Sequence, residues 1–268
     1  ARRIYTRTGD DISHAFPDVV AAMEFHGTLD GELLVRNADG TVAPFNALQQ
    51  RLNRKTVSKR QLETHPAFIR AYDLLQDGVR DLRGEAFRER RLRLEAFVLG
   101  IESDRFDLSP LVPITTLAAL DDARLDPPAP EIEGVMLKRW DSAYLAGRPK
   151  GLWYKWKRDP YLVDAVLMYA QRGHGKRSSF YSDFTFGVWR DEDGEDRLAP
   201  VGKAYFGFTD EELKQLDAFV RANTIDRFGP VRSVTANKET GIVLEVAFEG
   251  LQRSPRHKSG LAMRFPRI

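Results

Sequence analysis

The chain has 268 residues, with 41 lysines and arginines against 39 aspartates and glutamates and a formal net charge of +2 at pH 7, and this length suits one large or two ordinary domains. It contains no cysteine, which excludes disulfides and cysteine-ligated zinc within this span. It has no apolar run near the roughly 18 residues of a membrane-spanning helix and no signal-peptide pattern, so we expect a cytoplasmic protein.

The first half of the chain predicts mixed helix and strand. Residues 32–35 and 42–45 predict a β-hairpin, because the Asn-Ala-Asp-Gly segment between them supplies turn residues. Residues 85–98 carry apolar side chains at helical spacing and predict a surface helix with a buried stripe. Prolines within 127–130 then form a stiff connector into a strand that starts near Glu133.

A strand with two lysines on one face follows this connector. Lys155 and Lys157 are two positions apart, so in a strand they project from the same face, while Tyr154 and Trp156 project from the other. Two ammonium groups on one wall suit a polyanion. The structural alternative is an exposed lysine pair that protects an edge strand from aggregation.

Beyond Pro160 the apolar segments become shorter and alternate with polar residues. We expect strands at 162–168, 184–189 and 242–248. Thr209-Asp210-Glu211-Glu212 is a capping box that opens a helix. Several short strands with one helix predict a small β-barrel. We place the domain boundary near Pro160.

Basic residues gather in clusters despite the small net charge. The clusters lie within residues 51–60, 88–93, 172–177 and 253–258. Local potential, more than net charge, attracts phosphate. Any single cluster is also compatible with a solvated helix face.

Five segments occur in an order that carries a family signature. They are Tyr5-Thr6-Arg7-Thr8-Gly9, Leu29-Asp30-Gly31-Glu32-Leu33, Ala71-Tyr72-Asp73-Leu74-Leu75, Glu133-Gly134-Val135-Met136-Leu137-Lys138 and Trp153-Tyr154-Lys155-Trp156-Lys157. In this order they resemble the segment after the nucleophile motif and motifs III, IIIa, IV and V of the covalent nucleotidyltransferases, in the form found in ATP-dependent DNA ligases. Residues 169–175 and 256–260 resemble bacterial ligases that are encoded beside a helicase and a nuclease.

The resemblance implies an α+β fold in two domains. Residues 1–160 would form an adenylation (nucleotidyltransferase) domain of antiparallel sheets with flanking helices, and residues 161–268 an OB-fold β-barrel. The family's nucleophilic lysine, in K-x-D-G-x-R, is expected upstream of Tyr5, so the first domain would be incomplete at its N-terminus. The end of motif VI is expected after Ile268.

The resemblance also implies roles for individual residues in a reaction that uses ATP and Mg²⁺ or Mn²⁺. Lys155, Lys157, Glu32 and Glu133 would be catalytic and would bind the nucleotide together with Tyr72, which stacks on adenine. Glu32 and Glu133 would also bind the metal, and Arg7, Arg172, Lys176 and Arg177 would bind DNA. Lys138 is a doubtful member, because five positions from Glu133 it would face the opposite side of a regular strand.

Each of these residues has a structural alternative. Glu32 could be a carboxylate at the edge of a hairpin, with Asp30 and Gly31 in an ordinary turn. Tyr72 could be a core aromatic residue. The ordered set of motifs favours the functional interpretation.

The implied function is nick sealing in duplex DNA through enzyme-AMP and DNA-adenylate intermediates, as part of DNA repair. The implied partners are nicked duplex DNA and a repair helicase and nuclease, for a monomeric protein associated with the nucleoid and not with a membrane. An RNA ligase or capping-type nucleotidyltransferase shares the same motifs and is the first alternative. A noncatalytic nucleic-acid clamp is the second. The absence of cysteine argues against an NAD-dependent ligase, a class that carries a zinc finger.

Overall fold

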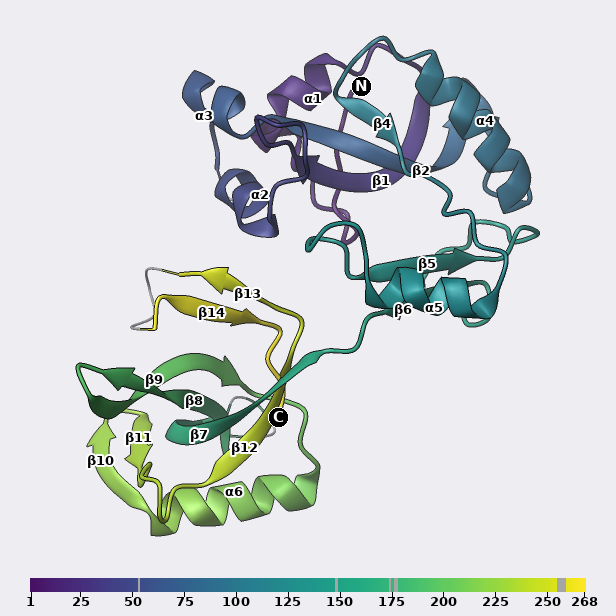
Figure 1. Cartoon of the computed structure of the whole chain (residues 1–268). Helices are drawn as coiled ribbons and strands as arrows, with labels where there is room; N and C mark the ends of the chain where they lie inside the picture. The colour runs from purple at the N-terminus through teal and green to yellow at the C-terminus, as the bar shows by residue number, and fades with distance from the viewer. Residues whose placement is uncertain (53, 148, 174, 176–177, 255–258) are drawn as a thin grey trace. The chain divides into compact units, whose positions relative to one another are not determined.

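The computed structural model describes residues 1–52, 54–147, 149–173, 175, 178–254 and 259–268. The chain divides into two units, residues 1–158 and 159–268 (Figure 1). The predicted boundary at Pro160 lies beside this division. Within the described ranges, no helix is both long enough and apolar enough to cross a membrane.

A small β-sheet forms the centre of the first unit. β1 (Gly27–Val35) pairs antiparallel with β2 (Ala67–Asp77), which also pairs with the short strands β3 (Arg80–Asp81) and, in parallel, β4 (Phe106–Leu108). Helix α4 (Phe87–Leu99) packs on β2 and confirms the helix predicted at 85–98. The other helices of this unit are η1 (Ser13–Ala15), α1 (Pro17–Ala21), α2 (Phe45–Leu52), α3 (Lys59–Thr64) and α5 (Leu117–Leu125).

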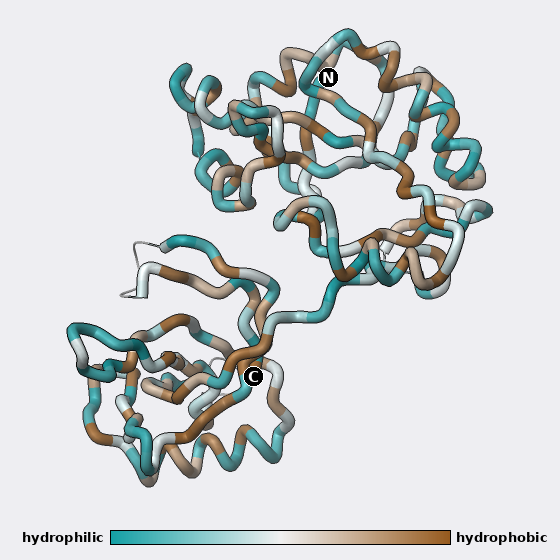
Figure 2. The backbone as a smooth tube through the Cα atoms, viewed as in Figure 1, coloured by the Kyte–Doolittle hydropathy of each residue, from teal (hydrophilic) through white to brown (hydrophobic). Residues whose placement is uncertain are grey.

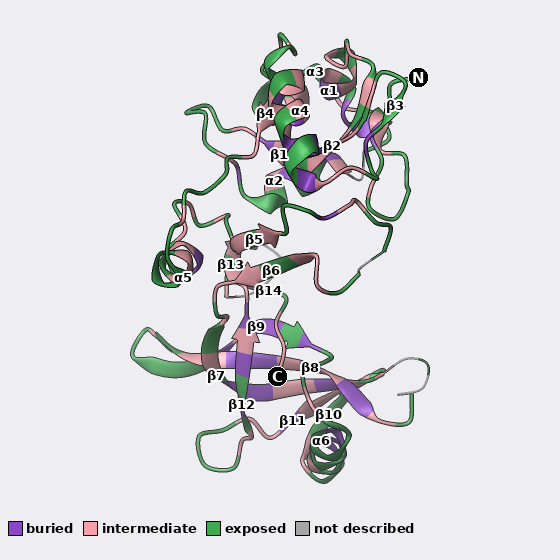
Figure 3. Ribbon diagram, turned by 90° about the vertical axis from the view of Figure 1, so that its right-hand side faces the viewer, coloured by how far each residue is buried: buried purple, intermediate pink, exposed green. Residues whose placement is uncertain are grey.

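Apolar residues of these elements form two buried clusters. One joins the N-terminal helices to β1, with Phe16, Val19 and Val35 fully or almost fully buried. The other lies between β2 and α4 and includes Leu74 and Leu94. The apolar segments are the brown stretches of the tube in Figure 2, and burial is mapped in Figure 3.

Two of the predicted basic clusters contain an arginine that is buried in the interior of this unit. Arg51 is fully buried, and its Nη2 lies 2.5 Å from the Asp18 carboxylate. Although burial acts to raise it, the hydrogen bond and charge of Arg51 hold the pKa of Asp18 below its ordinary value. Arg90 is also fully buried and pairs with Asp73 at 2.8 Å. These two guanidiniums are paired within the interior, and the expectation that they belong to exposed basic surfaces was wrong.

The predicted hairpin is reduced to one bridge. Arg36 and Val42 form an isolated antiparallel bridge, but β1 pairs with β2 and not with the predicted second strand. Pro44 has no N–H to continue a ladder, and helix α2 follows it. As a result, Asp30 and Glu32 lie inside a nine-residue strand and not at the entry of a hairpin.

The second unit is a curled antiparallel sheet with one helix, the OB-type fold that the sequence predicted. Its strand order is β10-β11-β7-β8-β9, with β12 also paired to β7. Helix α6 (Asp210–Ala222) begins with the predicted capping box between Thr209 and Glu212. The strands are β7 (Tyr161–Arg172), β8 (Tyr181–Glu192), β9 (Glu195–Ala204), β10 (Thr224–Phe228), β11 (Val231–Val234), β12 (Val243–Phe248), and the separate pair β13 (Gly250–Arg253) and β14 (Leu261–Arg264).

Strand β7 organises this sheet, because it pairs with three other strands. β8 pairs with residues 166–172, while β12 pairs with 161–166 and β11 with 169–171. Buried side chains of β7, β8 and α6, including Leu167, Phe184 and Val220, form the core of this unit.

Candidate functional site

A two-stranded ribbon, β5 (Gly134–Lys138) with β6 (Trp153–Lys157), carries several of the predicted site residues on one face. Directly opposite residues of antiparallel strands project to the same side. The three lysines Lys138, Lys155 and Lys157 therefore share a face. The register pairs Gly134 with Lys157, Met136 with Lys155, and Lys138 with Trp153.

The other face of the ribbon is structural. Helix α5 packs against both strands, and the Arg124 guanidinium carbon lies 5.2 Å from the centroid of the Trp156 ring. Arg124 also donates a 3.0 Å hydrogen bond to the carbonyl of Lys157. The predicted division of this strand into a lysine face and an aromatic face is thus confirmed at Trp156.

Glu133 and Lys157 come together at the start of the ribbon. The Lys157 Nζ lies 2.8 Å from a Glu133 carboxylate oxygen. Gly134 makes this contact possible, because its φ of +146° lies in a region that side chains rarely adopt. A Cβ on Gly134 would also lie 2.3 Å from the Trp156 carbonyl oxygen. Only glycine fits at this position.

The prediction that Lys138 faces away from the site was wrong. Glu133 precedes β5, and the unusual backbone of Gly134 separates it from the regular alternation of the strand. The alternation of side chains counted from Glu133 therefore does not predict the face on which Lys138 lies. The register instead places Lys138 opposite Trp153, on the face of Lys155 and Lys157.

The Lys138 ammonium lies among three aromatic rings. Its Nζ is 3.9 Å from the centroid of Trp153, 4.2 Å from that of Tyr72 and 4.8 Å from that of Phe87. It is buried and has no hydrogen-bond acceptor among the described residues. Burial lowers the pKa of Lys138 to about 8, against the opposing charges of Asp73 and Asp30.

Tyr72 is held at its hydroxyl by Asp30. The Tyr72 hydroxyl donates a 2.8 Å hydrogen bond to one carboxylate oxygen of Asp30, and the Tyr144 hydroxyl donates a 2.7 Å bond to the other. Burial, and then the charge of Asp30, raises the pKa of Tyr72, and burial with the same carboxylate raises the pKa of Tyr144. Both phenols therefore stay protonated and act as donors.

Glu32 lies on β1, exposed, and directly opposite Arg70 of β2. The Arg70 guanidinium makes a two-bond contact with Asp107, at 3.0 and 2.8 Å. The hydrogen bonds that Arg70 donates to Asp107, together with the charge of that carboxylate, raise the pKa of Arg70 despite its partial burial. Arg70 is thus fixed by Asp107, which leaves the Glu32 carboxylate directed to solvent on the strand.

Arg7 is exposed in a short turn near the N-terminus. The turn is closed by Thr6, which donates from its backbone to the Asp10 carbonyl at 2.9 Å. The Thr8 and Thr6 hydroxyls donate to the Asp10 carboxylate and lower its pKa. The turn is well defined by its own hydrogen bonds, so it presents the Arg7 side chain to solvent.

Of the predicted DNA-binding residues in the second unit, only Arg172 falls in the described ranges. It ends β7, is exposed, and lies 5.6 Å from the centroid of the Tyr181 ring. Arg221 lies 5.5 Å from the same ring and is bound to Asp217 at 2.7 Å. Lys176 and Arg177 lie outside the described residues.

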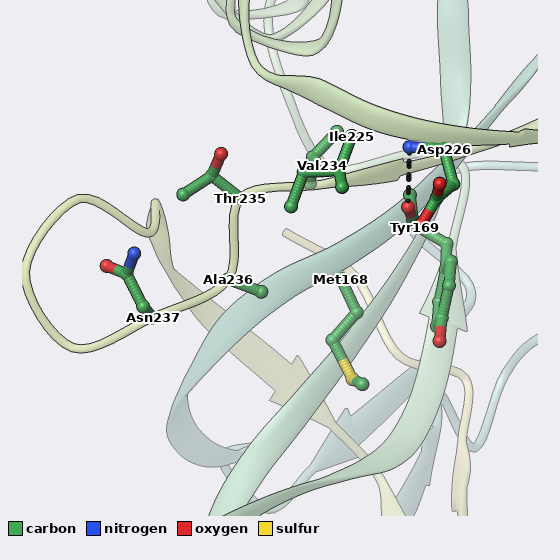
Figure 4. Close-up of a pocket in the computed structure, with 9 residues that line it drawn as sticks. Met168, Tyr169, Ile225, Asp226, Val234, Thr235, Ala236 and Asn237 are labelled. Carbon is green, nitrogen blue, oxygen red and sulfur yellow. Dashed lines mark hydrogen bonds between the residues drawn. The ribbon is translucent and has the colours of Figure 1, made fainter.

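A separate hollow in the second unit does not match the predicted chemistry. It lies between β7, β10 and β11 and extends to Asn237 (Figure 4). Asp226 is the one charged side chain among the nine residues that line it, and its backbone N–H bonds to the Ser233 hydroxyl at 3.1 Å. The lining offers no cation for a phosphate.

The described residues also contain no group of three or more histidine, cysteine, aspartate or glutamate side chains that could enclose a metal. Magnesium is usually bound by one or two carboxylates together with substrate phosphates. Glu32, which is exposed, and Glu133 therefore suit an ion that arrives with a nucleotide better than a resident ion.

The sequence missed the residues around Tyr72 and Lys138. Asp30 was placed in a motif but given no role of its own, and no role was given to the side chains of Tyr144, Phe87 and Trp153. The alternation of β6 does place Trp153 on the face of Lys155, which is a signal in the sequence. Tyr144 lies 114 residues from Asp30, and no local pattern links the two.

Two family models match the chain in sequence. Residues 1–157 match the model described as the ATP dependent DNA ligase domain, and residues 177–268 match the ATP dependent DNA ligase C terminal region. A probable DNA ligase of Koribacter versatilis is 36% identical over 99% of this chain and 49% of its own length. A DNA ligase of Halorubrum lacusprofundi is 35% identical over 99% of this chain and 43% of its own. The chain thus spans about half the length of these relatives.

A solved structure from work on Lig E DNA ligases has a similar fold. It superimposes with a TM-score of 0.62, covers 99% of this chain and 84% of its own, and is 16% identical. This likeness bears on the fold alone.

Proposed function

The chain belongs to the ATP-dependent DNA ligase family, and from that membership we propose that it contributes the catalytic domains of an enzyme that seals nicks in duplex DNA at the expense of ATP. The observation that supports this best is the shared face of Lys155 and Lys157 on β6, with Glu133 ion-paired to Lys157. Cations so placed can meet charge that develops on phosphate oxygens.

In the first step a lysine, expected upstream of Tyr5, attacks the α-phosphorus of ATP. A bond from lysine nitrogen to phosphorus forms, the bond to the departing oxygen breaks, and pyrophosphate leaves. Lys155 and Lys157 stabilise the negative charge on the phosphate oxygens. Tyr72 stacks on the adenine, and Glu32 binds the ribose hydroxyls.

Glu32 and Glu133 would hold the divalent ion that neutralises the phosphates. The Glu133 carboxylate is ion-paired with Lys157 through one oxygen, and phosphates that compete for the lysine would leave more of this carboxylate to the ion. We propose Mg²⁺ as the ion, because it is usually bound by one or two carboxylates together with phosphates; Mn²⁺ is the alternative.

In the later steps AMP passes to the 5′-phosphate at the nick, and the 3′-hydroxyl then attacks that phosphate and displaces AMP. Arg7 binds the nick phosphate, a role that suits the forked donors of a guanidinium. Arg172, Lys176 and Arg177 bind the duplex from the OB-fold domain. The biological setting we propose is DNA repair by a monomeric enzyme, with a helicase and a nuclease as partners.

The test uses the full-length protein that carries this chain, with Mg²⁺, ATP and a nicked duplex, and follows strand joining on a denaturing gel. Sealing of the DNA nick, lost on Lys157→Ala or Glu32→Ala, supports the proposal. Sealing confined to nicked RNA would reassign the protein to the RNA ligases. Binding of the duplex without adenylation or sealing would leave only a clamp.

A further inference from the structure

The Tyr72 ring is fixed from two directions. Its hydroxyl donates to Asp30, whose second oxygen is occupied by Tyr144. The Lys138 ammonium covers its ring at 4.2 Å from the centroid. A tyrosine has two rotatable side-chain bonds, and a contact at the hydroxyl with another at the ring face restrains both.

Lys138 is itself held by its surroundings. Its buried Nζ lacks a hydrogen-bond acceptor among the described residues, an arrangement that is unfavourable for a charged group unless something compensates. The faces of Tyr72, Phe87 and Trp153 provide that compensation through cation–π attraction. A lysine that served the phosphates directly would be expected to keep its ammonium accessible.

Hydrogen bonds fix the surrounding backbone as well. Asp73, next to Tyr72, is fully buried and pairs with Arg90, which donates to the Ser142 carbonyl at 3.0 Å. The Trp153 indole N–H donates to the Ser142 hydroxyl at 3.1 Å. One network therefore connects β2, which carries Tyr72, to β6, which carries Trp153.

We propose that Asp30 and Lys138 are positioning residues that hold the Tyr72 ring for stacking on the nucleotide base. Asp30 fixes the hydroxyl, and Lys138 occupies one face of the ring, so that the base stacks on the other face. Both residues act through Tyr72 and neither contacts the phosphates. This inference rests on the proposed function, since it assigns Tyr72 to the base of ATP.

The proposal separates recognition of the base from recognition of the phosphates. Loosening Tyr72 weakens binding of the adenosine part, while Lys155 and Lys157 still bind the phosphates. Substitutions at Asp30 and Lys138 should therefore change the KM for ATP much more than kcat. They should leave inhibition by tripolyphosphate, which has no base, unchanged.

The experiment measures formation of enzyme-AMP by the full-length protein over a range of ATP concentrations. Lys138→Met and Asp30→Asn should each raise the KM for ATP about tenfold, which corresponds to about 1.4 kcal/mol, with kcat within about twofold of wild type. Lys138→Arg, which keeps a cation that stacks on rings, should restore the KM. Lys150→Met and Tyr154→Phe are matched controls, because both side chains are exposed and lie outside the network.

Two results would overturn the proposal. One is a loss of kcat together with weaker tripolyphosphate inhibition in Lys138→Met, which would place Lys138 on the phosphates. The other is an unchanged KM in variants whose thermal melting matches wild type. If wild type forms no enzyme-AMP, the proposed function fails instead, and equilibrium binding of ATP against tripolyphosphate in the same variants still tests the positioning role. If Asp30→Asn melts early, it is replaced by Tyr72→Phe, which removes only the bond to Asp30.

Discussion

Gly134 lies directly opposite Lys157 across the β5–β6 ribbon, and its backbone lets Glu133 reach the Lys157 ammonium. The two strands approach so closely here that the Gly134 position has no room for a side chain. The pairing of Gly134 with Lys157 thus sets both the spacing of the two strands and the position of the Glu133 carboxylate. Glycine is therefore required at position 134 for a steric reason that is independent of catalysis.

Gly134→Ala should destabilise the first unit by about 2–4 kcal/mol, because it combines strain at positive φ with a clash against backbone. Urea denaturation followed by tryptophan fluorescence measures this. Gly84→Ala is the matched control, since Gly84 has no atom within 4 Å of its added Cβ and no positive φ. Equal midpoints for the two variants would contradict the steric argument.

Lys157→Ala should reduce the rate of enzyme-AMP formation by roughly 100-fold or more, because it removes a cation that stabilises charge on the phosphate oxygens. Its effect on stability should be small, about 0–1 kcal/mol, since the ion pair with Glu133 is partly exposed. Radiolabelled ATP and gel analysis measure the rate, and Lys150→Ala serves as the control. A wild-type rate in Lys157→Ala would remove Lys157 from the chemistry.

Arg7→Ala should separate the steps of the reaction. Arg7 is exposed and its turn is closed by Thr6, Thr8 and Asp10, so the substitution should leave the fold and enzyme-AMP formation intact. Sealing of a nicked duplex should fall by about 10- to 100-fold, the effect of losing a charge-assisted hydrogen bond of about 1.5–3 kcal/mol. Single-turnover sealing by pre-adenylated enzyme measures this. Arg2→Ala, another exposed arginine nearby, should seal normally, and a defect shared by both would point to a nonspecific loss of charge.

The depressed pKa of Lys138 predicts a pH-dependent difference in stability. Below about pH 8 the lysine is protonated in both the folded and unfolded states. The free energies of unfolding of the wild type and Lys138→Met should therefore differ by a constant amount in this range. Between pH 8 and 10 the folded state releases its proton first, and the unfolded state binds more protons. The free energy of unfolding of the wild type relative to Lys138→Met should therefore rise with pH, by at most about 1.4 kcal/mol per unit. A flat or falling difference over this range would show that the ammonium is not buried.

The sequence predicted the architecture where the signal is local. The capping box at Thr209 starts α6, and the alternation of β6 places Lys155 and Lys157 on one face. Both patterns depend on neighbours within a few residues. The same alternation failed between Glu133 and Lys138, because one glycine outside the usual dihedral range interrupts it.

Burial of charge could not be predicted in this way. Arg51 and Arg90 lie in runs of basic residues and were interpreted as surface, but their partners Asp18 and Asp73 are 33 and 17 residues away. The β1–β2 pairing also joins residues far apart in the chain, and it displaced the shorter-range hairpin. Such pairs depend on the folded topology and leave no periodic trace.

The pairing of strand β7 determines which parts of the second unit exchange their amide hydrogens first and which last. This strand pairs with β8 from residue 166 onward and with β12 and β11 on its other side, so the amides in its middle are protected by more than one strand. In contrast, β13 and β14 pair only with each other within the described sheets. Hydrogen exchange in this unit should therefore be fastest in the β13–β14 pair and slowest in the middle of β7.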